Sequence, residues 1–398
     1  MEMLLDQREF IERYCMREIL STYDPYDIWK TGVGYHAKAL YNRHPLAGLL
    51  PAAILTLFDI YLNNTWRFGY RKQEYPIVRA FAALSLLNLY GESADQNHLL
   101  VAKEHLDWLK ENTCAGYTGA CWGLGFRHTV SPTVTYGAGQ PLITITAYPL
   151  EAFIAYSKAT GDHTYDETIR SVYAFLRKDL HVMEETETTL ATSYGPFKDR
   201  VVTNAVSYAM YSYALLLTYI AEHEAAALRQ RVRKLYRFIQ SKQRDDGSWL
   251  YSLEGNSFID CFHSCIIIKN ILKTESLCPL PEARKVAETG YRYLKDRHWD
   301  SRHRLFMRFS LHNKPSIVRF DLYDNAEALN LALLLEDHEM ANILKGSILK
   351  YFVEGNDFYS TIVLFGGRKN KNMLRWAAMP FVYALSQMGA VVDGTNRN

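Results

Sequence analysis

The sequence predicts an all-α fold, an (α/α)6 toroid in which an inner ring of six helices is surrounded by six outer helices. Segments with one polar face alternate along the chain with segments that are apolar on nearly every side. A helix with a polar face lies at a surface, whereas a helix that is apolar all round is buried. The 398 residues, 48% of them hydrophobic and 22% charged, suit a protein with a large core.

The predicted outer helices cover residues 94–111, 163–180, 225–243, 282–297 and 339–353. The predicted inner helices cover residues 76–90, 139–160, 202–222, 260–274, 323–337 and 375–388. The apolar segment 46–63 is expected to be the sixth outer helix and to pair with the last inner helix. Residues 1–20 are expected to form an amphipathic helix outside the ring. We expect a single toroid domain over residues 1–398, with an N-terminal extension over residues 1–45.

A short motif recurs at the end of each predicted outer helix. A pair of apolar residues, the first of them aromatic, is followed by a turn and then by another aromatic residue. The motif occurs at Trp108-Leu109 before Trp122, Phe175-Leu176 before Tyr194, Phe238-Ile239 before Trp249, Tyr293-Leu294 before Phe306, and Tyr351-Phe352 before Phe358. Because each hairpin needs neighbours to bury its apolar face, the repeat favours one ring over separate domains.

Composition and motifs exclude several functions. The net charge of +2 provides no basic field for nucleic acid. The six cysteines have no zinc-site spacing, and no nucleotide-binding glycine motif follows a strand, so we predict no metal and no cofactor. The N-terminus lacks the apolar stretch of a signal peptide, and no run approaches the length of a membrane span. A cytoplasmic location is therefore expected.

Polar residues stand at the starts of the predicted inner helices. These starts meet at one end of the ring, where the helix dipoles favour anions. The polar residues at these starts are Gln140, Asn204, Asp260, His263, Asp321, Tyr323, Asp324, Asn325, Arg375 and, beside it, Trp376. Capping of the helices is the competing interpretation for each Asp and Asn, but it does not account for His263, Tyr323 or Arg375. We predict a ligand pocket here, in the central cavity of the toroid.

Four of these residues are candidates for catalysis. Asp260 and Asp324 come from adjacent inner helices and would face each other as the paired carboxylates that act on glycosidic bonds. His263 or Tyr323 would instead abstract a proton from carbon, as an epimerase or a lyase requires. The sequence leaves both possibilities open.

Residues around the same end of the ring are candidates for substrate binding. They comprise arginines, which would hold a carboxylate or phosphate, aromatic rings, which would stack on a sugar, and other polar residues of the loops and helix starts. The candidates are Asp24, Tyr26, Asp27, Trp122, Arg127, His128, Gln140, Tyr194, Asn204, Trp249, Arg319, Arg375 and Trp376. The alternative for the aromatic residues is packing, and for Asp24 and Asp27 it is capping of a helix.

Gln243, Gly247 and Trp249 resemble the QxxxGxW element of terpenoid cyclases. This element is a structural part of α/α toroids, so the resemblance supports the fold. The sequence FDLYDN at 320–325 does not have the spacing of the acidic signature of those cyclases. An isoprenoid-handling enzyme is therefore kept as an alternative function.

A second resemblance extends from about Tyr23 to Leu385. It rests on YDPYD, GQPLITITAYPLEAFIAYSKATGDHTYDE, TNAVSYA, and QRDDGSWLY with FIDCFH. These segments resemble α/α-toroid proteins encoded with bacterial capsule and exopolysaccharide genes. They are also similar to sugar-epimerase toroids, including the helical domain of glucuronyl C5-epimerases and N-acylglucosamine 2-epimerase-like proteins.

The second resemblance implies a carbohydrate-active enzyme of bacterial surface-polysaccharide biosynthesis or processing. Its substrate would be a glycan, a sugar nucleotide or a lipid-linked oligosaccharide. Epimerase, glycosidase and lyase chemistry all remain open, as does the oligomeric state. A non-catalytic toroid that binds a glycan or acts as a scaffold is the further alternative.

Overall fold

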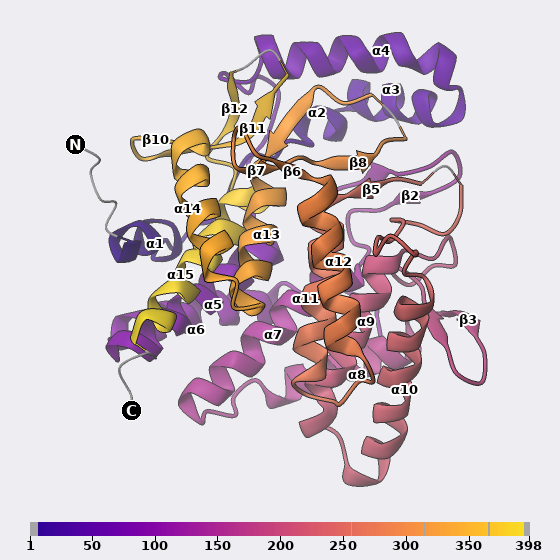
Figure 1. The fold of residues 1–398 in the computed structure, drawn as a ribbon, viewed down its shortest axis with the longest axis vertical. Helices are drawn as coiled ribbons and strands as arrows, with labels where there is room; N and C mark the ends of the chain where they lie inside the picture. Colours follow the sequence, from indigo (N-terminus) through magenta and orange to yellow (C-terminus); the bar gives the residue numbers. More distant parts are fainter. Residues whose placement is uncertain (1–6, 256, 314, 365–366, 394–398) are drawn as a thin grey trace.

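The computed structural model describes residues 7–255, 257–313, 315–364 and 367–393, and its helices form two layers (Figure 1). In this described part, the six inner helices are α5 (Pro76–Ser93), α7 (Ile143–Thr160), α9 (Thr203–Leu215), α11 (Cys261–Glu275), α13 (Leu322–Leu334) and α15 (Met379–Asp393). Each inner helix packs against the next along the chain, and α15 packs against α5. The last inner helix therefore lies beside the first.

Outer helices alternate with the inner ones and pack against them. Five are the predicted helices, α6 (Gln96–Glu111), α8 (Asp166–Lys178), α10 (Glu222–Ser241), α12 (Ala283–Arg297) and α14 (His338–Phe352). A short 3-10 turn, η2 (Leu216–Thr218), follows the end of α9 and precedes α10. The predicted (α/α)6 arrangement is confirmed.

The sixth outer helix is α1 (Gln7–Cys15), which packs against α15 and α5 and buries Phe10 and Tyr14. The prediction that residues 1–20 lie outside the ring is therefore wrong, as is the assignment of 46–63 as the sixth outer helix. The physical reason is the pattern along each helix. An outer helix buries one stripe and exposes a polar face, which α1 does, whereas 46–63 is apolar on nearly every side.

Residues 46–63 belong to a hairpin at one end of the molecule (Figure 1). Helix α2 (Asp27–Lys30) leads into α3 (Gly32–Arg43), which pairs with α4 (Pro45–Leu57) and the π-helical turn η1 (Phe58–Leu62). Within the described residues, one helix, Pro45–Leu62, is long enough and apolar enough to cross a membrane, and 17% of it is buried inside the structure. The prediction that no run approaches that length is wrong. A single such helix is weak support for a span.

The recurring aromatic motif has a structural explanation. The Trp122 indole N–H donates to the Leu109 carbonyl at 2.9 Å, and the Trp249 indole donates to the Ile239 carbonyl at 2.9 Å. Each indole therefore reaches back to the aliphatic residue that closes the preceding outer helix. Gly247 has a φ of +91°, which an L side chain rarely adopts, so the turn before Trp249 favours glycine.

Short antiparallel strands fill the connections at the end of the ring where the inner helices begin (Figure 1). They are β1 (His128–Thr129), β2 (Thr135–Tyr136), β3 (Val182–Glu185), β4 (Leu190–Thr192), β5 (Ile259–Asp260), β6 (Trp299–Asp300), β7 (Leu305–Phe306), β8 (Phe309–Leu311), β9 (Val318–Asp321), β10 (Val353–Glu354), β11 (Asp357–Val363) and β12 (Arg368–Lys371). Two of them matter for the site, because β5 runs directly into α11 and β9 runs directly into α13. We call this end the mouth of the ring.

Candidate functional site

The junction of β5 and α11 holds an aspartate–histidine pair. Asp260 is the N-cap of α11, and its Oδ1 accepts the backbone N–H of His263 at 3.2 Å. The same carboxylate lies 2.8 and 2.7 Å from His263 Nδ1. The Asp260 side chain is buried, whereas 17% of the His263 side chain is exposed. The carboxylate therefore fixes the orientation of the ring and leaves Nε2 without a hydrogen-bond partner among the described residues.

The junction of β9 and α13 holds a second buried carboxylate. Asp321 is the N-cap of α13 and accepts the Tyr323 backbone N–H at 2.9 Å. The Arg308 guanidinium donates to it at 2.9 Å, and the Trp376 indole N–H donates at 3.0 Å. Burial raises the pKa of Asp321, although the Arg308 charge opposes this. Arg308 keeps one buried donor, Nε, without a partner.

Asp324 does not occupy the position predicted for a catalytic carboxylate. Its side chain is fully buried, and Oδ1 accepts the Phe262 backbone N–H at 2.9 Å, inside the first turn of α11. Burial is the main cause that raises the pKa of Asp324 well above its ordinary value, and Arg308 partly offsets this. Asp324 therefore joins α13 to α11 and does not face Asp260 across an open site.

Arg375 and Asp24 form a buried ion pair beside the start of α15. The guanidinium donates to both carboxylate oxygens of Asp24, one of them at 2.8 Å, and lies over the rings of Tyr26 and Tyr75. Burial raises the pKa of Asp24, but the Arg375 charge outweighs it and the pKa is lowered overall. Both charges are satisfied within the protein. Arg375, predicted to hold an anionic substrate, is paired instead with Asp24, predicted to lie in a substrate-binding loop, and the pair fixes the YDPYD segment to the ring.

Aromatic rings line the mouth next to these groups. Trp376 stacks on Tyr323 at 4.8 Å between ring centroids, and Phe262 meets the edges of both. Tyr26 packs edge-on against Trp376 at 5.7 Å. The next residue, Ala377, has a φ of 120°, a conformation that an L-residue adopts only under strain. Such strain persists where the surrounding structure holds the backbone in place, and here it directly follows Trp376, whose indole N–H is bonded to Asp321.

The other predicted loop residues form a neighbouring group. Tyr194 stacks on Tyr136 at 5.8 Å, and His128 lies 5.0 Å from the same ring. Burial lowers the pKa of His128 to about 4, so this imidazole is neutral at neutral pH. Arg127 is exposed and donates to the hydroxyl of Tyr35 on α3.

Two further predicted residues lie near the mouth. Asp27 pairs with Lys30 at 2.8 Å, and burial raises its pKa despite that cation. Asn204 is buried at the start of α9, and its Oδ1 has no partner within the described residues.

Four predicted binding residues are placed elsewhere. Trp122 and Trp249 are buried and hydrogen-bonded to outer helices, so they pack the fold. Gln140 accepts the Gly137 N–H at 2.7 Å within a turn. Arg319 lies 3.7 Å from Asp300 and does not reach the Asp260–His263 pair. The pattern of polar and aromatic residues cannot separate such packing from ligand binding.

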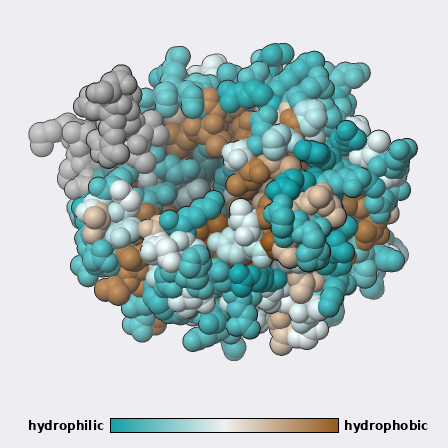
Figure 2. All heavy atoms as spheres, turned by 90° about the horizontal axis from the view of Figure 1, so that it is seen from below, coloured by the Kyte–Doolittle hydropathy of each residue, from teal (hydrophilic) through white to brown (hydrophobic). Residues whose placement is uncertain are grey.

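The interior of the ring is nearly filled below the mouth. The Tyr148 and Tyr208 hydroxyls are 2.5 Å apart, and Lys269 pairs with Glu327. The space lined by these helices holds about 10 Å³, roughly one water molecule. Figure 2 shows the end of the molecule opposite α4, which is hollowed near its centre. The Asp260–His263 pair lies at the mouth, and this hollow lies at the opposite end of the ring.

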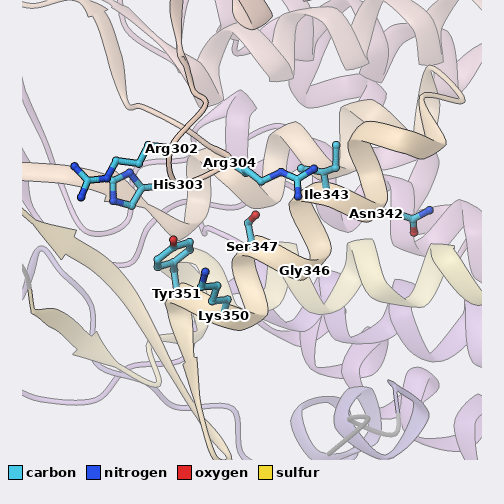
Figure 3. A pocket seen from close by; sticks show the side chains of 9 residues that line it. All are labelled: Arg302, His303, Arg304, Asn342, Ile343, Gly346, Ser347, Lys350 and Tyr351. Carbon is cyan, nitrogen blue, oxygen red and sulfur yellow. The ribbon is translucent and has the colours of Figure 1, made fainter. Parts of the chain in front are cut away.

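A larger pocket of about 400 Å³ lies outside the ring, against α14 (Figure 3). It is lined by α14 and by the turn between β6 and β7, where His303 Nδ1 lies 2.9 Å from Asp300. The His303 and Tyr351 rings are 5.5 Å apart. Asp300 and His303 are three residues apart, as Asp260 and His263 are, but they lie on the outer wall of the ring. The Asp300–His303 pair is therefore a control for the Asp260–His263 pair.

The fold is similar to those of solved carbohydrate-processing enzymes. A cellobiose 2-epimerase from Bacillus thermoamylovorans matches with a TM-score of 0.61 at 12% identity, over 80% of this chain and 88% of that one. A sugar epimerase from a ruminal bacterium gives 0.59 at 14% identity, over 83% and 91%. An α-mannanase from Bacteroides thetaiotaomicron gives 0.56 at 11% identity, over 93% and 100%. No protein-family model and no curated protein sequence matches the chain.

These likenesses confirm the expected relation to sugar-epimerase toroids at the level of fold. At such low identities they do not transfer a reaction. The chemistry has to be argued from the side chains at the mouth.

Proposed function

We propose that this chain is a carbohydrate-processing enzyme that moves a proton at a sugar carbon, as epimerases and isomerases do. The observation that carries the proposal is the Asp260–His263 pair at the mouth of a toroid whose fold is similar to that of sugar epimerases. A histidine with one nitrogen held by a carboxylate and the other free is arranged to act as a general base.

In the proposed step, His263 Nε2 takes a proton from the carbon next to the carbonyl of an open-chain sugar. The C–H bond breaks, an N–H bond forms, and the electron pair moves onto the carbonyl oxygen as an enolate. Asp260 stabilises the imidazolium that results. Arg308, paired with Asp321, would supply the positive charge that stabilises the enolate oxygen. Return of the proton to the other face of the same carbon gives the epimer. Its return to the former carbonyl carbon, with the hydroxyl proton passing from O2 to O1, gives the ketose isomer.

The burial of the carboxylates favours this chemistry over hydrolysis of a glycosidic bond. Hydrolysis needs two carboxyl groups that both reach the substrate. Asp324 and Asp24 are fully buried, and Asp260 is engaged with His263. The charged mouth also counts against an isoprenoid-handling enzyme, whose pocket would be mainly apolar.

The setting in bacterial surface-polysaccharide biosynthesis is part of the proposal and rests on the resemblance of YDPYD and the segments that follow. A glycan with a free reducing end would be the substrate, because the reducing-end carbon of a sugar nucleotide or a lipid-linked oligosaccharide is bonded to phosphate and cannot open to a carbonyl. Trp376 and Phe262, which are buried to all but 8% and 7% of their surface, are the rings on which we propose that a sugar ring stacks.

Isotope exchange tests the proposed reaction directly. The protein is incubated in D2O with reducing hexoses, N-acetylhexosamines, uronic acids and their disaccharides, and the products are followed by NMR. We expect deuterium at the carbon beside the carbonyl, together with an epimer or ketose. New reducing ends without exchange would indicate hydrolysis, and binding without any product would indicate a glycan-binding protein. Either result would overturn the proposal.

A further inference from the structure

An apolar stripe runs along the outside of the α3–α4 hairpin. More than half of the large apolar side chains that are exposed in the described residues lie within the segment 33–68. On α4 and η1 they recur at Leu46, Leu50, Ile54, Leu57 and Tyr61. Steps of three or four residues place these side chains on one face of a helix, which is about 20 Å long over this interval.

The opposite face of α4 packs on α3, and the turn after η1 is bonded to β12, where Asn64 and Arg67 both donate to Asn370 Oδ1 at 2.8 Å. Gly48 lies so close to α3 that a Cβ atom there would be 2.2 Å from Tyr41 Cα. The Asp59 carboxylate accepts the Tyr70 hydroxyl at 2.6 Å and lies 3.7 Å from Arg67. These contacts determine which side of α4 faces outward, so the fold itself places the apolar stripe on the surface.

The charge around the stripe has one sign. In the sequence from 28 to 73 the single carboxylate is Asp59, and it is buried. Cationic residues on the surface of the same segment are Lys38, Arg43, Arg71 and Lys72. An apolar face surrounded by cations is complementary to a bilayer with anionic headgroups.

Aromatic residues continue the stripe at its end. The turn after η1 exposes 81% of Trp66 and 83% of Phe68. Lys369 of β12 lies 5.1 Å from the centre of the Tyr61 ring. Tryptophan and tyrosine favour the boundary between lipid headgroups and acyl chains, because one part of each ring is apolar and another is polar.

We propose that the α3–α4 hairpin docks on an anionic lipid bilayer, with α4 lying in the interface and not crossing it. Asp59 and the contacts of Gly48 tie one face of the helix to the protein, which a crossing helix would have to release. A second copy fits less well, because a twofold contact would place the cationic rim of each hairpin against its equivalent.

The hairpin is also attached to the mouth. Asn42 of α3 donates to Thr129 of β1 at 3.2 Å, and Figure 1 shows α3 and α4 at the end of the molecule where the short strands lie. If the proposed function holds, docking brings the mouth to the membrane surface. The inference therefore favours a reducing glycan present at the membrane surface over one free in solution as the substrate.

Vesicle sedimentation tests the docking. The full chain is mixed with vesicles of phosphatidylcholine alone or with added phosphatidylglycerol, at low and high salt. We expect binding to the anionic vesicles, weaker binding at high salt, and a blue shift of the Trp66 fluorescence that is absent in Trp66→Phe. The double variant Leu50→Glu with Ile54→Glu should bind at least about tenfold more weakly.

A matched control uses exposed leucines outside the hairpin, Leu100→Glu with Leu277→Glu, which should bind vesicles like the wild type. Circular dichroism checks that each variant is folded, and His263→Gln should keep its vesicle binding, so the docking is tested apart from the reaction. No binding by the wild type would overturn the proposal, as would equal binding by Leu50→Glu with Ile54→Glu. A dimer lost in that variant would assign the stripe to a second copy and would also overturn it.

Discussion

Replacing His263 by glutamine should lower kcat for the proposed sugar reaction by about a thousandfold, with little change in KM or stability. Glutamine preserves a polar side chain but cannot take a proton from carbon. The imidazole is partly exposed and caps nothing, so α11 should keep its structure. The measurement is the initial rate of deuterium exchange, with the melting temperature recorded for the same preparation.

Two further variants make this result specific. Asp260→Asn keeps a good N-cap for α11 but removes the charge beside His263 Nδ1, so kcat should fall by about a hundredfold. His303→Gln removes an imidazole with the same spacing from its aspartate, but on the outer wall, and should leave the rate unchanged. A loss of activity in His303→Gln and not in His263→Gln would show that the active site is the pocket against α14.

Replacing Asp24 by asparagine should lower the free energy of unfolding by about 3 kcal/mol at neutral pH. The change leaves the Arg375 guanidinium buried without its counter-charge. Removing both charges with Arg375→Met in the same chain should recover part of the loss. Denaturant unfolding measures these differences, with Glu288→Gln as the control, since the exposed Arg284–Glu288 pair is expected to contribute less than about 1 kcal/mol.

The Asp24 variant should also change the response to acid. Arg375 holds the folded-state pKa of Asp24 below its ordinary value, although burial acts in the opposite direction. The ion pair therefore contributes stability above the unfolded-state pKa of about 4, and this contribution is lost as the pH falls through the lower, folded-state pKa. The stability difference between Asp24→Asn and the wild type should shrink as the pH falls. A constant difference, or one below about 1 kcal/mol at neutral pH, would contradict the assigned role of the pair.

The alternation of inner and outer helices could be predicted because it follows from the pattern of apolar and polar residues within each helix. Each inner helix is apolar all round, and each outer helix ends in the aromatic motif that Trp122 and Trp249 explain. The segment 46–63 was misplaced because an exposed apolar helix and a buried one look alike in sequence. The charge and hydropathy of a helix do not show which other elements pack against it.

The site could be predicted only in part, because burial depends on contacts between distant segments. Asp260 and Asp324 both stand at inner-helix starts, yet one orients a partly exposed histidine and the other is buried against the backbone of Phe262. Arg308 was missed because the pairing of β5 with β8, which sets Asp260 opposite Phe309, brings it to the mouth. Nothing in the residues around Arg308 indicates that pairing.

A structure with a bound reducing oligosaccharide tests the role of His263 most directly. The proposed reaction predicts a sugar at the mouth, stacked on Trp376, with a carbon beside its carbonyl about 3–3.5 Å from His263 Nε2. A sugar bound only in the pocket against α14, or at the mouth with Nε2 turned away from every C–H bond, would contradict it.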